Sequence, residues 1–200
     1  MDTCCYICYY NGNTDFSLVE KLIPDERLKD LERFPEERRR QSLLAEALLR
    51  FMLHEHPGDN NIQITRSAGG KPGCSLCEVS ISHTDGAIAV AFSDGPIGID
   101  IEKLRRGRMR AAKAYFTEAE YELAVNSPDT AFWEIWTRKE AYAKALGTGM
   151  SYELSETDTL HSPIAEKLRT ESKGEYTFTV YSENNCSIFE RTAEEFISRL

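Results

Sequence analysis

The sequence predicts an α+β fold in which two halves repeat a similar arrangement. Short apolar stretches bounded by turn residues indicate strands, and long stretches with apolar residues three and four apart indicate amphipathic helices. Each half contains a strand, a long helix and a small antiparallel set in similar order. We therefore expect a pseudo-duplicated protein, with one half in residues 1–95 and the other in residues 96–200, each holding a small antiparallel sheet and a long helix.

The first half opens with a predicted strand over residues 4–10. Helices are predicted over 24–34 and 35–53, because both stretches begin with proline, which suits the first position of a helix. In the second helix apolar side chains recur at helical spacing, and residues 38–40 place three arginines in its first turns. These arginines form either a solvated face or an anion site.

Three short apolar stretches joined by tight turns link the two halves. They read "EVSISH", "AIAVAF" and "IGIDIE" and predict an antiparallel meander over residues 78–83, 87–92 and 97–102. In the third stretch every second residue is isoleucine, so one face of this strand belongs in a core. The opposite face carries Asp100 and Glu102, which lie about 7 Å apart along the strand.

The second half continues with a basic segment that becomes an amphipathic helix within residues 103–126. The next helix, within 127–149, has the clearest signals: Ser127 as N-cap, Pro128 in the first turn and Gly147 as C-terminal cap. The elements predicted beyond residue 150 are a strand near 176–181, a turn at Asn184 and Asn185, a short strand and a terminal helix at 192–200.

The composition is that of an ordinary globular domain. The chain has 200 residues, a formal net charge of -9 and no apolar run long enough to span a membrane. The first fifteen residues lack a basic segment and a small-residue cleavage site, so we expect no signal peptide and a cytoplasmic protein. The net negative charge argues against broad nucleic-acid binding, although local basic patches remain compatible with it.

Six cysteines allow two interpretations. Cys5 with Cys8 and Cys74 with Cys77 each have the C-x-x-C spacing of half a zinc site, and the four together could form a Cys4 site. However, C-x-x-C pairs alone are a weak signal, and cysteine in a first strand commonly acts as a small buried apolar residue. We favour the second interpretation; the sequence assigns no role to Cys4 or to the sixth cysteine, Cys186.

Three acids and a lysine form the strongest chemical signal. Asp100 and Glu102 share a strand face, and Glu140 lies on a helix face with Trp133 and Trp136. A carboxylate buried beside tryptophan is costly unless it is paired, and Mg²⁺ with its preference for carboxylate oxygens would remove that cost. Lys144, one turn after Glu140, either forms a salt bridge with it or offsets phosphate charge. The spacing alone leaves a metal site and a structural acid cluster open.

These residues resemble the signature pair of the 4'-phosphopantetheinyl transferases. The family pattern is a (I/V)-G-(I/V)-D-x-E strand, complete here at 97–102, and a W-x-x-K-E-A-x-x-K helix, complete at 136–144. The segments "GGKP" at 69–72, "SISH" at 80–83 and "RRRQSLLAEALLR" at 38–50 also match. The resemblance covers roughly residues 20 to 155, and the chain length favours the monomeric surfactin-synthetase-activating type with two halves.

The resemblance implies transfer of the phosphopantetheine arm of coenzyme A to a serine of an acyl or peptidyl carrier protein, with release of adenosine 3',5'-bisphosphate. Asp100, Glu102 and Glu140 would hold Mg²⁺ with the pyrophosphate. Glu140 would be the base for the serine, and Lys144 would stabilise the leaving phosphate.

The resemblance also implies which half holds coenzyme A. The first half would hold its adenine and 3'-phosphate, and the second half carries the metal and catalytic motifs. The residues matched to the coenzyme A site are Arg40 and Ser42 near the 3'-phosphate, Lys71 and Pro72 at the adenine, Ser82 and His83 at the phosphates, and Lys139.

The match has departures. Glu26 stands where relatives often have lysine, which puts the details of 3'-phosphate recognition in doubt, and residues beyond 155 match poorly. Glu120 matches another acid of the active-site region, without an assigned role.

A basic segment beside the acidic strand predicts where a carrier protein would dock, because carriers are typically acidic and the chain as a whole is not basic. Its members are Lys103, Arg105, Arg106, Arg108 and Arg110, with Met109, Tyr115 and Phe116 as apolar neighbours. The alternative is a solvated loop. The sequence does not say which pathway the carrier serves.

Two other functions remain as alternatives. One is a non-catalytic relative that binds coenzyme A or a carrier protein, which the intact acids and Lys144 disfavour. The other is a Mg²⁺-dependent phosphoesterase or nuclease, which the net charge disfavours.

Overall fold

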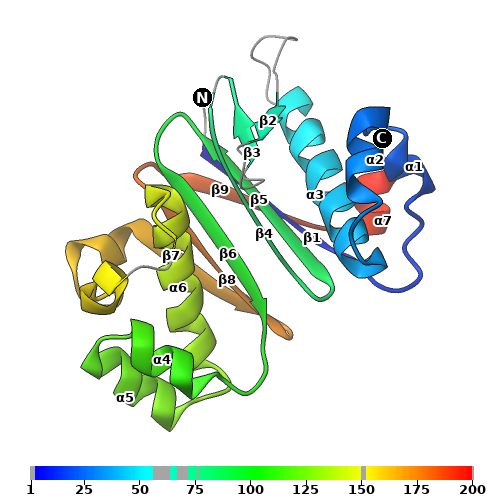
Figure 1. The fold of residues 1–200 in the computed structure, drawn as a ribbon. Helices are drawn as coiled ribbons and strands as arrows, with labels where there is room; N and C mark the ends of the chain where they lie inside the picture. The colour runs from blue at the N-terminus through cyan, green and yellow to red at the C-terminus, as the bar shows by residue number, and fades with distance from the viewer. Residues whose placement is uncertain (1–2, 56–63, 67–71, 76, 150–151, 200) are drawn as a thin grey trace.

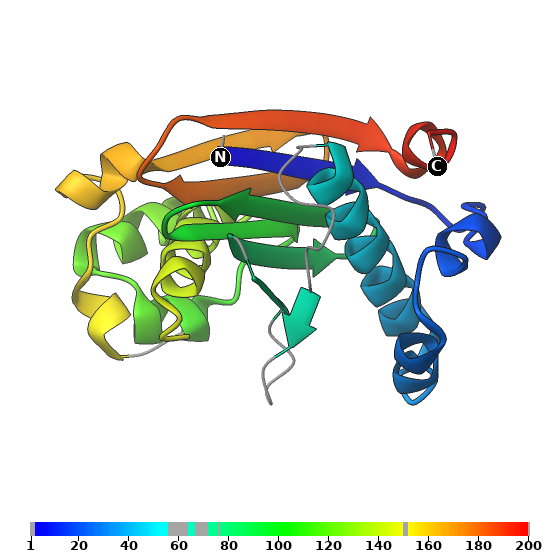
Figure 2. The ribbon, with the colours of Figure 1, turned by 90° about the horizontal axis from the view of Figure 1, so that it is seen from above.

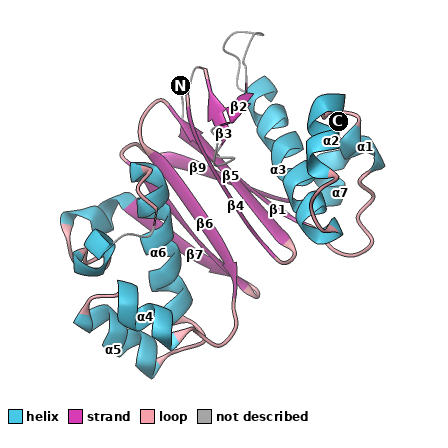
Figure 3. Ribbon diagram, in the orientation of Figure 1, coloured by secondary structure: helices cyan, strands magenta, loops and turns pink. Residues whose placement is uncertain are grey.

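The computed structural model describes residues 3–55, 64–66, 72–75, 77–149 and 152–199 and confirms the expected α+β class (Figure 3). The strands are β1 (Thr3–Tyr9), β2 (Ile64–Arg66), β3 (Pro72–Cys74), β4 (Glu78–Thr84), β5 (Ala87–Ser93), β6 (Ile97–Lys103), β7 (Leu168–Lys173), β8 (Tyr176–Ser182) and β9 (Cys186–Thr192). The helices are α1 (Ser17–Glu20), α2 (Asp25–Leu31), α3 (Glu36–Glu55), α4 (Met109–Tyr115), α5 (Glu118–Asn126), α6 (Ala131–Leu146) and α7 (Ala193–Ile197), with 3-10 turns η1 (Tyr152–Glu156) and η2 (Pro163–Lys167). In this described part of the chain, no helix combines the length and apolar character needed to cross a membrane.

The sheet topology supports the expected duplication. The first sheet has the order β4-β5-β1-β9 and the second the order β6-β8-β7, while β2 and β3 form a separate pair. In each half the opening strand pairs antiparallel with the second strand of a hairpin: β1 with β5, and β6 with β8. A long helix, α3 or α6, lies between the opening strand and the hairpin in the chain. The two halves therefore share one strand–helix–hairpin plan.

The elements form four layers. Figures 1 and 2 show α3 with its neighbouring helices on one side of the strands and α6 on the other. Strand β5 is buried along its whole length, and its alternate residues serve two cores. Ile88, Val90 and Phe92 join the core beneath α3, whereas Ala87, Ala89 and Ala91 join the core that contains β6 and β8. The small alanines allow the two sheets to approach each other closely.

The predicted meander is wrong in its third strand. Strands β4 and β5 form the expected hairpin, but β6 pairs with β8. The reason is that β5 pairs with β4 along one edge and with β1 along the other, so neither edge is left for β6. The predicted apolar face of β6 is confirmed, because Ile97, Ile99 and Ile101 are all buried in the core between the sheets.

The end of the chain returns to the first sheet. Strand β9 pairs parallel with β1, and Ala193 and Phe196 of α7 lie in the core beneath α3. Residues 186–199 are therefore packed with the first half, so the predicted second half of residues 96–200 does not extend to the end of the chain as one structural unit. The division near residue 95 itself coincides with the step from the first sheet to the second.

The helices between β6 and β7 differ from prediction at their ends. The expected single helix in residues 103–126 is two helices, because Thr117 and Glu120 form a capping box that starts α5. Ser127 follows the last turn of α5, and α6 has Thr130 at its N-cap position. The predicted C-terminal cap is confirmed, since Gly147 has a φ of 70°.

Gly98 determines how closely α6 approaches β6. A Cβ atom at this position would lie 1.8 Å from the carbonyl oxygen of Ala141 in α6, so only glycine allows the observed contact. Because alternate residues of a strand share a face, Asp100 and Glu102 lie on the same side of β6 as Gly98. The acidic face of this strand therefore faces the helix that carries Glu140 and Lys144.

We expect Gly98→Ala to lower the free energy of unfolding by at least about 2 kcal/mol, because two backbone segments would have to move apart. Gly95→Ala is the matched control, since a Cβ atom there meets nothing within 4 Å, and its effect should stay within about 0.5 kcal/mol. Urea denaturation of both variants measures the difference. Equal stability of the two variants would contradict this account of the helix contact.

Candidate active site

Strands β4 and β6 meet through side-chain hydroxyl groups. Ser80, Ser82 and Thr84 alternate along β4 and are all buried. The Ser80 hydroxyl accepts a hydrogen bond from the Ile99 amide at 3.0 Å, and the Thr84 hydroxyl accepts one from the Lys103 amide at 3.3 Å. These contacts satisfy backbone groups of β6 and bring the end of the first sheet beside the acidic strand.

Asp100 is the most enclosed of the three predicted acids. Its side chain is 7% exposed, and its Oδ1 atom accepts hydrogen bonds from Ser82 Oγ at 2.7 Å and from Lys144 Nζ at 2.6 Å. Lys144 also donates to the Ile99 carbonyl oxygen at 3.0 Å. The other carboxylate oxygen, Oδ2, is buried and has no hydrogen-bond partner among the described residues. An unpaired buried carboxylate oxygen is costly and indicates that a partner, such as an ion, is missing.

Glu102 lies one strand repeat further along and is half-buried. Burial and the nearby negative charge of Asp100 raise its pKa to about 7. Its Oε2 atom accepts a hydrogen bond from Thr84 and lies 3.2 Å from an Nη atom of Arg105. At neutral pH this carboxyl is poised between its charged and neutral forms, and an added cation would favour the charged form.

Glu140 and His83 complete the group from two other elements. Partial burial and the charge of Asp100 raise the pKa of Glu140, while Lys144 opposes this effect. His83, at the end of β4, keeps an exposed surface; partial desolvation lowers its pKa, and the positive charges of Lys144 and Arg38 lower it further. The structure therefore brings five predicted residues around Asp100: Ser82, His83, Glu102, Glu140 and Lys144.

The donors fit a hard divalent cation, which prefers carboxylate oxygens. The fit rests on the partnerless Oδ2 of Asp100 and on the raised pKa values of its two acidic neighbours. Within the described ranges, no three acids, histidines or cysteines already converge as a preassembled metal site. The two acids of β6 instead form ion pairs with basic side chains: Asp100 pairs with Lys144, and Glu102 pairs with Arg105. Lys144 thus reaches across to β6 and forms its ion pair with Asp100, so the alternative of a salt bridge with Glu140 is not the one observed.

The predicted residues of α3 separate onto two faces. Arg38 lies close enough to His83 to lower its pKa, and Ser42 follows one turn later on the same side of the helix. Arg40 points elsewhere: it donates to the Thr14 carbonyl oxygen at 3.2 Å and lies over the ring of Phe16. Arg40 and Ser42, which the resemblance places together near the 3'-phosphate, therefore point in different directions from α3, because two positions along a helix differ by about 200° in direction.

Arg40 lines a separate pocket of roughly 340 Å³ between α3 and the segment that follows β1. Its other lining residues are Thr14, Asp15, Phe16, Glu20, Glu36, Arg39 and Leu43. Both acids and arginines line it, and Arg39 is already paired with Glu20 at 2.9 Å.

The predicted adenine residues lie at the edge of the described chain. Pro72 is in β3, opposite Arg66 of β2, and Lys71 lies outside the described residues. The zinc alternative does not fit the first C-x-x-C pair, because Cys5 and Cys8 lie in cores on opposite faces of β1. Burial raises the pKa of both thiols, to about 12 for Cys8, as expected for apolar packing.

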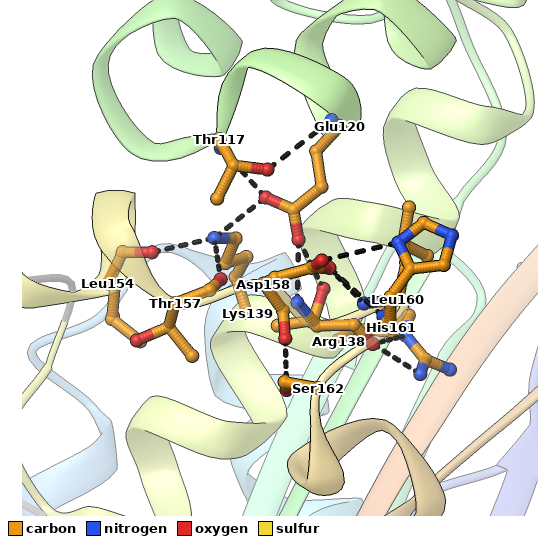
Figure 4. A network of polar contacts seen from close by, with 11 residues as sticks. Thr117, Glu120, Arg138, Lys139, Leu154, Thr157, Asp158, Leu160, His161 and Ser162 are labelled. Carbon is orange, nitrogen blue, oxygen red and sulfur yellow. Dashed lines mark hydrogen bonds and ion pairs between the residues drawn. The ribbon is translucent and has the colours of Figure 1, made fainter.

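Lys139 has a structural environment that does not agree with its predicted contact to coenzyme A. Its side chain is fully buried, and its ammonium group lies 2.8 Å from Glu120 and donates to the carbonyl oxygens of Leu154 and Thr157 (Figure 4). These three contacts use all three of its hydrogens. Glu120, whose role the sequence left open, also accepts hydrogen bonds from Thr117 and from Thr159. The pair joins α5, α6 and the segment after η1.

Two features of the site are not among those predicted from the sequence. The first is the contribution of Ser80 and Thr84 on β4, although their alternation with Ser82 within a strand signals a polar contact. The second is the folding of Arg105 back onto Glu102 and Trp133. The pair with Glu102 is only three residues apart in the chain, whereas the contact with Trp133 has no local signal because it depends on how α6 packs beside the loop.

The fold and the site define a class of two-half α+β proteins in which acids, a lysine and a histidine from both halves surround a position suited to a cation and to anionic groups. A family model described as the 4'-phosphopantetheinyl transferase superfamily matches residues 96–194. The chain is 36% identical over 139 residues to 4'-phosphopantetheinyl transferase AcpT of Escherichia coli strain K12, covering 64% of this chain and 68% of that protein. The chain belongs to the 4'-phosphopantetheinyl transferase superfamily.

Two further relatives carry the same family name. The chain is 38% identical over 117 residues to 4'-phosphopantetheinyl transferase gsp of Aneurinibacillus migulanus, covering 55% of this chain and 49% of the relative. It is 30% identical over 140 residues to 4'-phosphopantetheinyl transferase Sfp of Bacillus subtilis strain 168, covering 66% and 62%. The matched part of the chain thus spans about half the length of gsp and somewhat more of the other two.

We expect Lys139→Met to lower the free energy of unfolding by about 3–5 kcal/mol, because it leaves the buried charge of Glu120 without its cation. Lys113→Met, at an exposed position of α4, is the matched control and should change stability by less than about 0.5 kcal/mol. Chemical denaturation gives both values. A stable Lys139→Met variant with a raised KM for coenzyme A would instead support the original assignment to the cofactor.

Proposed function

We propose that this protein transfers the 4'-phosphopantetheine group of coenzyme A to a serine of an acyl or peptidyl carrier protein. Membership of the family and the two complete motifs support this proposal. The single observation that carries it is the environment of Asp100: one oxygen held by Ser82 and Lys144, the other buried without a partner, with Glu102 and Glu140 nearby. This arrangement suits a cation and a pyrophosphate at the same place.

The proposed chemistry assigns one task to each group. Asp100, Glu102 and Glu140 would hold Mg²⁺, which supplies neutralisation of charge on the pyrophosphate when it is bound. Glu140, which lies beside Asp100, accepts the proton of the carrier serine. The serine oxygen forms a bond to the phosphorus next to pantetheine, and the bond to adenosine 3',5'-bisphosphate breaks. Lys144 stabilises the charge on the departing phosphate.

The first half supplies the proposed contacts to the rest of coenzyme A. Ser82 holds Asp100 in place and His83 faces the phosphates. Arg38 and Ser42 share a side of α3 toward His83, so we place them at the 3'-phosphate in preference to Arg40. Lys71 and Pro72 remain the proposed adenine contacts. A monomeric state and a cytoplasmic location belong to the same proposal.

The decisive experiment incubates the protein with fluorescent coenzyme A, Mg²⁺ and a panel of apo carrier proteins. Label on a carrier serine supports the transferase. Binding of coenzyme A without transfer to any carrier would favour a non-catalytic relative, and cleavage of an oligonucleotide would favour a phosphoesterase or nuclease.

We expect Asp100→Asn to remove most transfer activity with little change in fold, because it takes away the charge that the cation needs. Lys144→Ala should lower kcat more than it raises the KM for coenzyme A, since its proposed role is in the transition state. Steady-state kinetics and circular dichroism measure both variants, with Lys113→Ala as an exposed lysine control. Full activity of wild-type protein in EDTA would contradict the metal role, and a change limited to KM would make Lys144 a binding residue.

We also propose that the carrier docks on the basic segment after β6. Arg106, Arg108 and Arg110 are exposed there, beside the acids, with the partly buried Met109 and Tyr115 next to them. Phe116 does not belong to this surface, because its side chain is buried in the core between α4, α5 and α6. Arg105 belongs to the same segment but already pairs with Glu102, so a change at Arg105 would disturb the acids as well.

We expect Arg106→Glu with Arg110→Glu to raise the KM for the carrier severalfold and to leave the KM for coenzyme A unchanged, because surface charges act mainly on encounter. The defect should shrink above roughly 0.5 M salt, where charges are screened over a few ångströms. Initial rates at several ionic strengths give the answer. An unchanged carrier KM at low salt would place the docking surface elsewhere.

A further inference from the structure

Arg105 occupies an unusual position beside the acids. Its guanidinium lies 3.2 Å from Glu102 Oε2 and 4.4 Å from the centre of the Trp133 ring. An Nη atom also donates to the Lys103 carbonyl oxygen at 3.4 Å. The side chain is 42% exposed, so this cation sits at the rim of the site and has open solvent beside it.

The backbone around Arg105 is fixed more firmly than its side chain. The indole nitrogen of Trp133, a fully buried residue, donates a hydrogen bond to the Arg105 carbonyl oxygen. Two residues later the Gly107 amide donates to the Pro128 carbonyl oxygen at 2.8 Å, and Gly107 packs directly on Phe132. The guanidinium can therefore leave Glu102 by rotation of its side chain while the loop stays in place.

A cation bound between the acids would use the same carboxylate that Arg105 now occupies. The two charges have the same sign, so they repel each other as well as compete for Glu102. The exposed pair with Glu102 is weak, and the stack on Trp133 adds a modest further attraction. A divalent cation that is also bound by Asp100 and Glu140 would bind the Glu102 carboxylate more strongly than Arg105 does.

We propose that Arg105 is an internal counter-ion of Glu102 that a divalent cation displaces, and that its release adds a positive charge to the exposed basic segment. This inference rests on the proposed function. Arg106, Arg108 and Arg110 are exposed on the same segment, so a released Arg105 joins them. Occupation of the cation site and association with an acidic carrier are thereby coupled, and each strengthens the other by the same factor.

The first test measures Mn²⁺ binding to the free protein by the loss of the electron paramagnetic resonance signal of free Mn²⁺. Arg105→Gln should bind Mn²⁺ about three- to tenfold more tightly than wild type, because the competing charge and its stacking are gone. Arg106→Gln removes the same charge one residue away, where no contact with Glu102 is found in the described structure, and should change the affinity less than about twofold.

A double-mutant cycle shows whether the effect passes through Glu102. In a Glu102→Gln background, Arg105→Gln should change the Mn²⁺ affinity much less than it does in the wild-type background, because only the repulsion between the two cations remains. A direct readout of displacement is the arginine side-chain signal in ¹H–¹⁵N spectra that is missing from Arg105→Gln. This signal should move on addition of Mg²⁺ as the guanidinium leaves the Trp133 ring.

Three results would overturn the inference: equal or weaker Mn²⁺ binding in Arg105→Gln, an equal gain in Arg106→Gln, or undetectable binding in both Arg105→Gln and wild type. The transfer assay with wild-type protein decides the proposed function separately. If the wild-type protein transfers the label but Arg105→Gln shows no gain in Mn²⁺ affinity, only the counter-ion proposal is rejected. If Arg105→Gln shows the expected gain in Mn²⁺ affinity but no carrier is labelled, only the proposed transferase function is rejected.

Discussion

The hydrogen bond from Ser82 to Asp100 joins two sheets whose strands do not pair with each other, and the site depends on it. Asp100 is nearly enclosed, and a carboxylate in that position needs partners on every side. Ser82 supplies one from β4 and Lys144 supplies another from α6. Lys144 reaches β6 only because Gly98 lets the helix lie against the strand. A serine, a glycine and a lysine far apart in the chain therefore determine where one carboxylate lies.

Two lysines of α6 form ion pairs with acids, and the pairs differ in how many of their polar atoms have hydrogen-bond partners. This difference distinguishes a structural pair from a pair in the candidate active site. In the Glu120–Lys139 pair, the lysine has three acceptors and both carboxylate oxygens are bonded, so nothing remains for a ligand. In the Asp100–Lys144 pair one carboxylate oxygen has no partner in the described part of the chain, and the lysine is partly exposed. Adjacent motif residues, Lys139 and Glu140, thus serve opposite purposes: the first anchors the helix and the second faces the acids.

Local patterns predicted most of the elements and several of the side chains that lie around Asp100, but not the way in which the elements meet. The alternation in β6 gave its buried isoleucines and its acidic face because a strand exposes alternate residues to opposite sides. Strand pairing has no such local signal, so the predicted meander placed β6 next to β5. Strand β7 was missed because it is a polar edge strand without alternating apolar residues. Spacing along the chain likewise did not show that Arg40 and Ser42 point in different directions from α3, because two positions along a helix differ by about 200° in direction.

The charges around the site explain how the protein folds with three acids near one another. Three neighbouring carboxylates repel, and burial raises the pKa of Glu102 and Glu140. Lys144 and Arg105 offset two of these charges within the folded chain. The two cations differ in how they are held, since Lys144 is bonded to both a carboxylate and the β6 backbone, whereas Arg105 lies on the rim over an aromatic ring. The first cation therefore belongs to the framework of the site, and the second is held loosely enough to be exchanged.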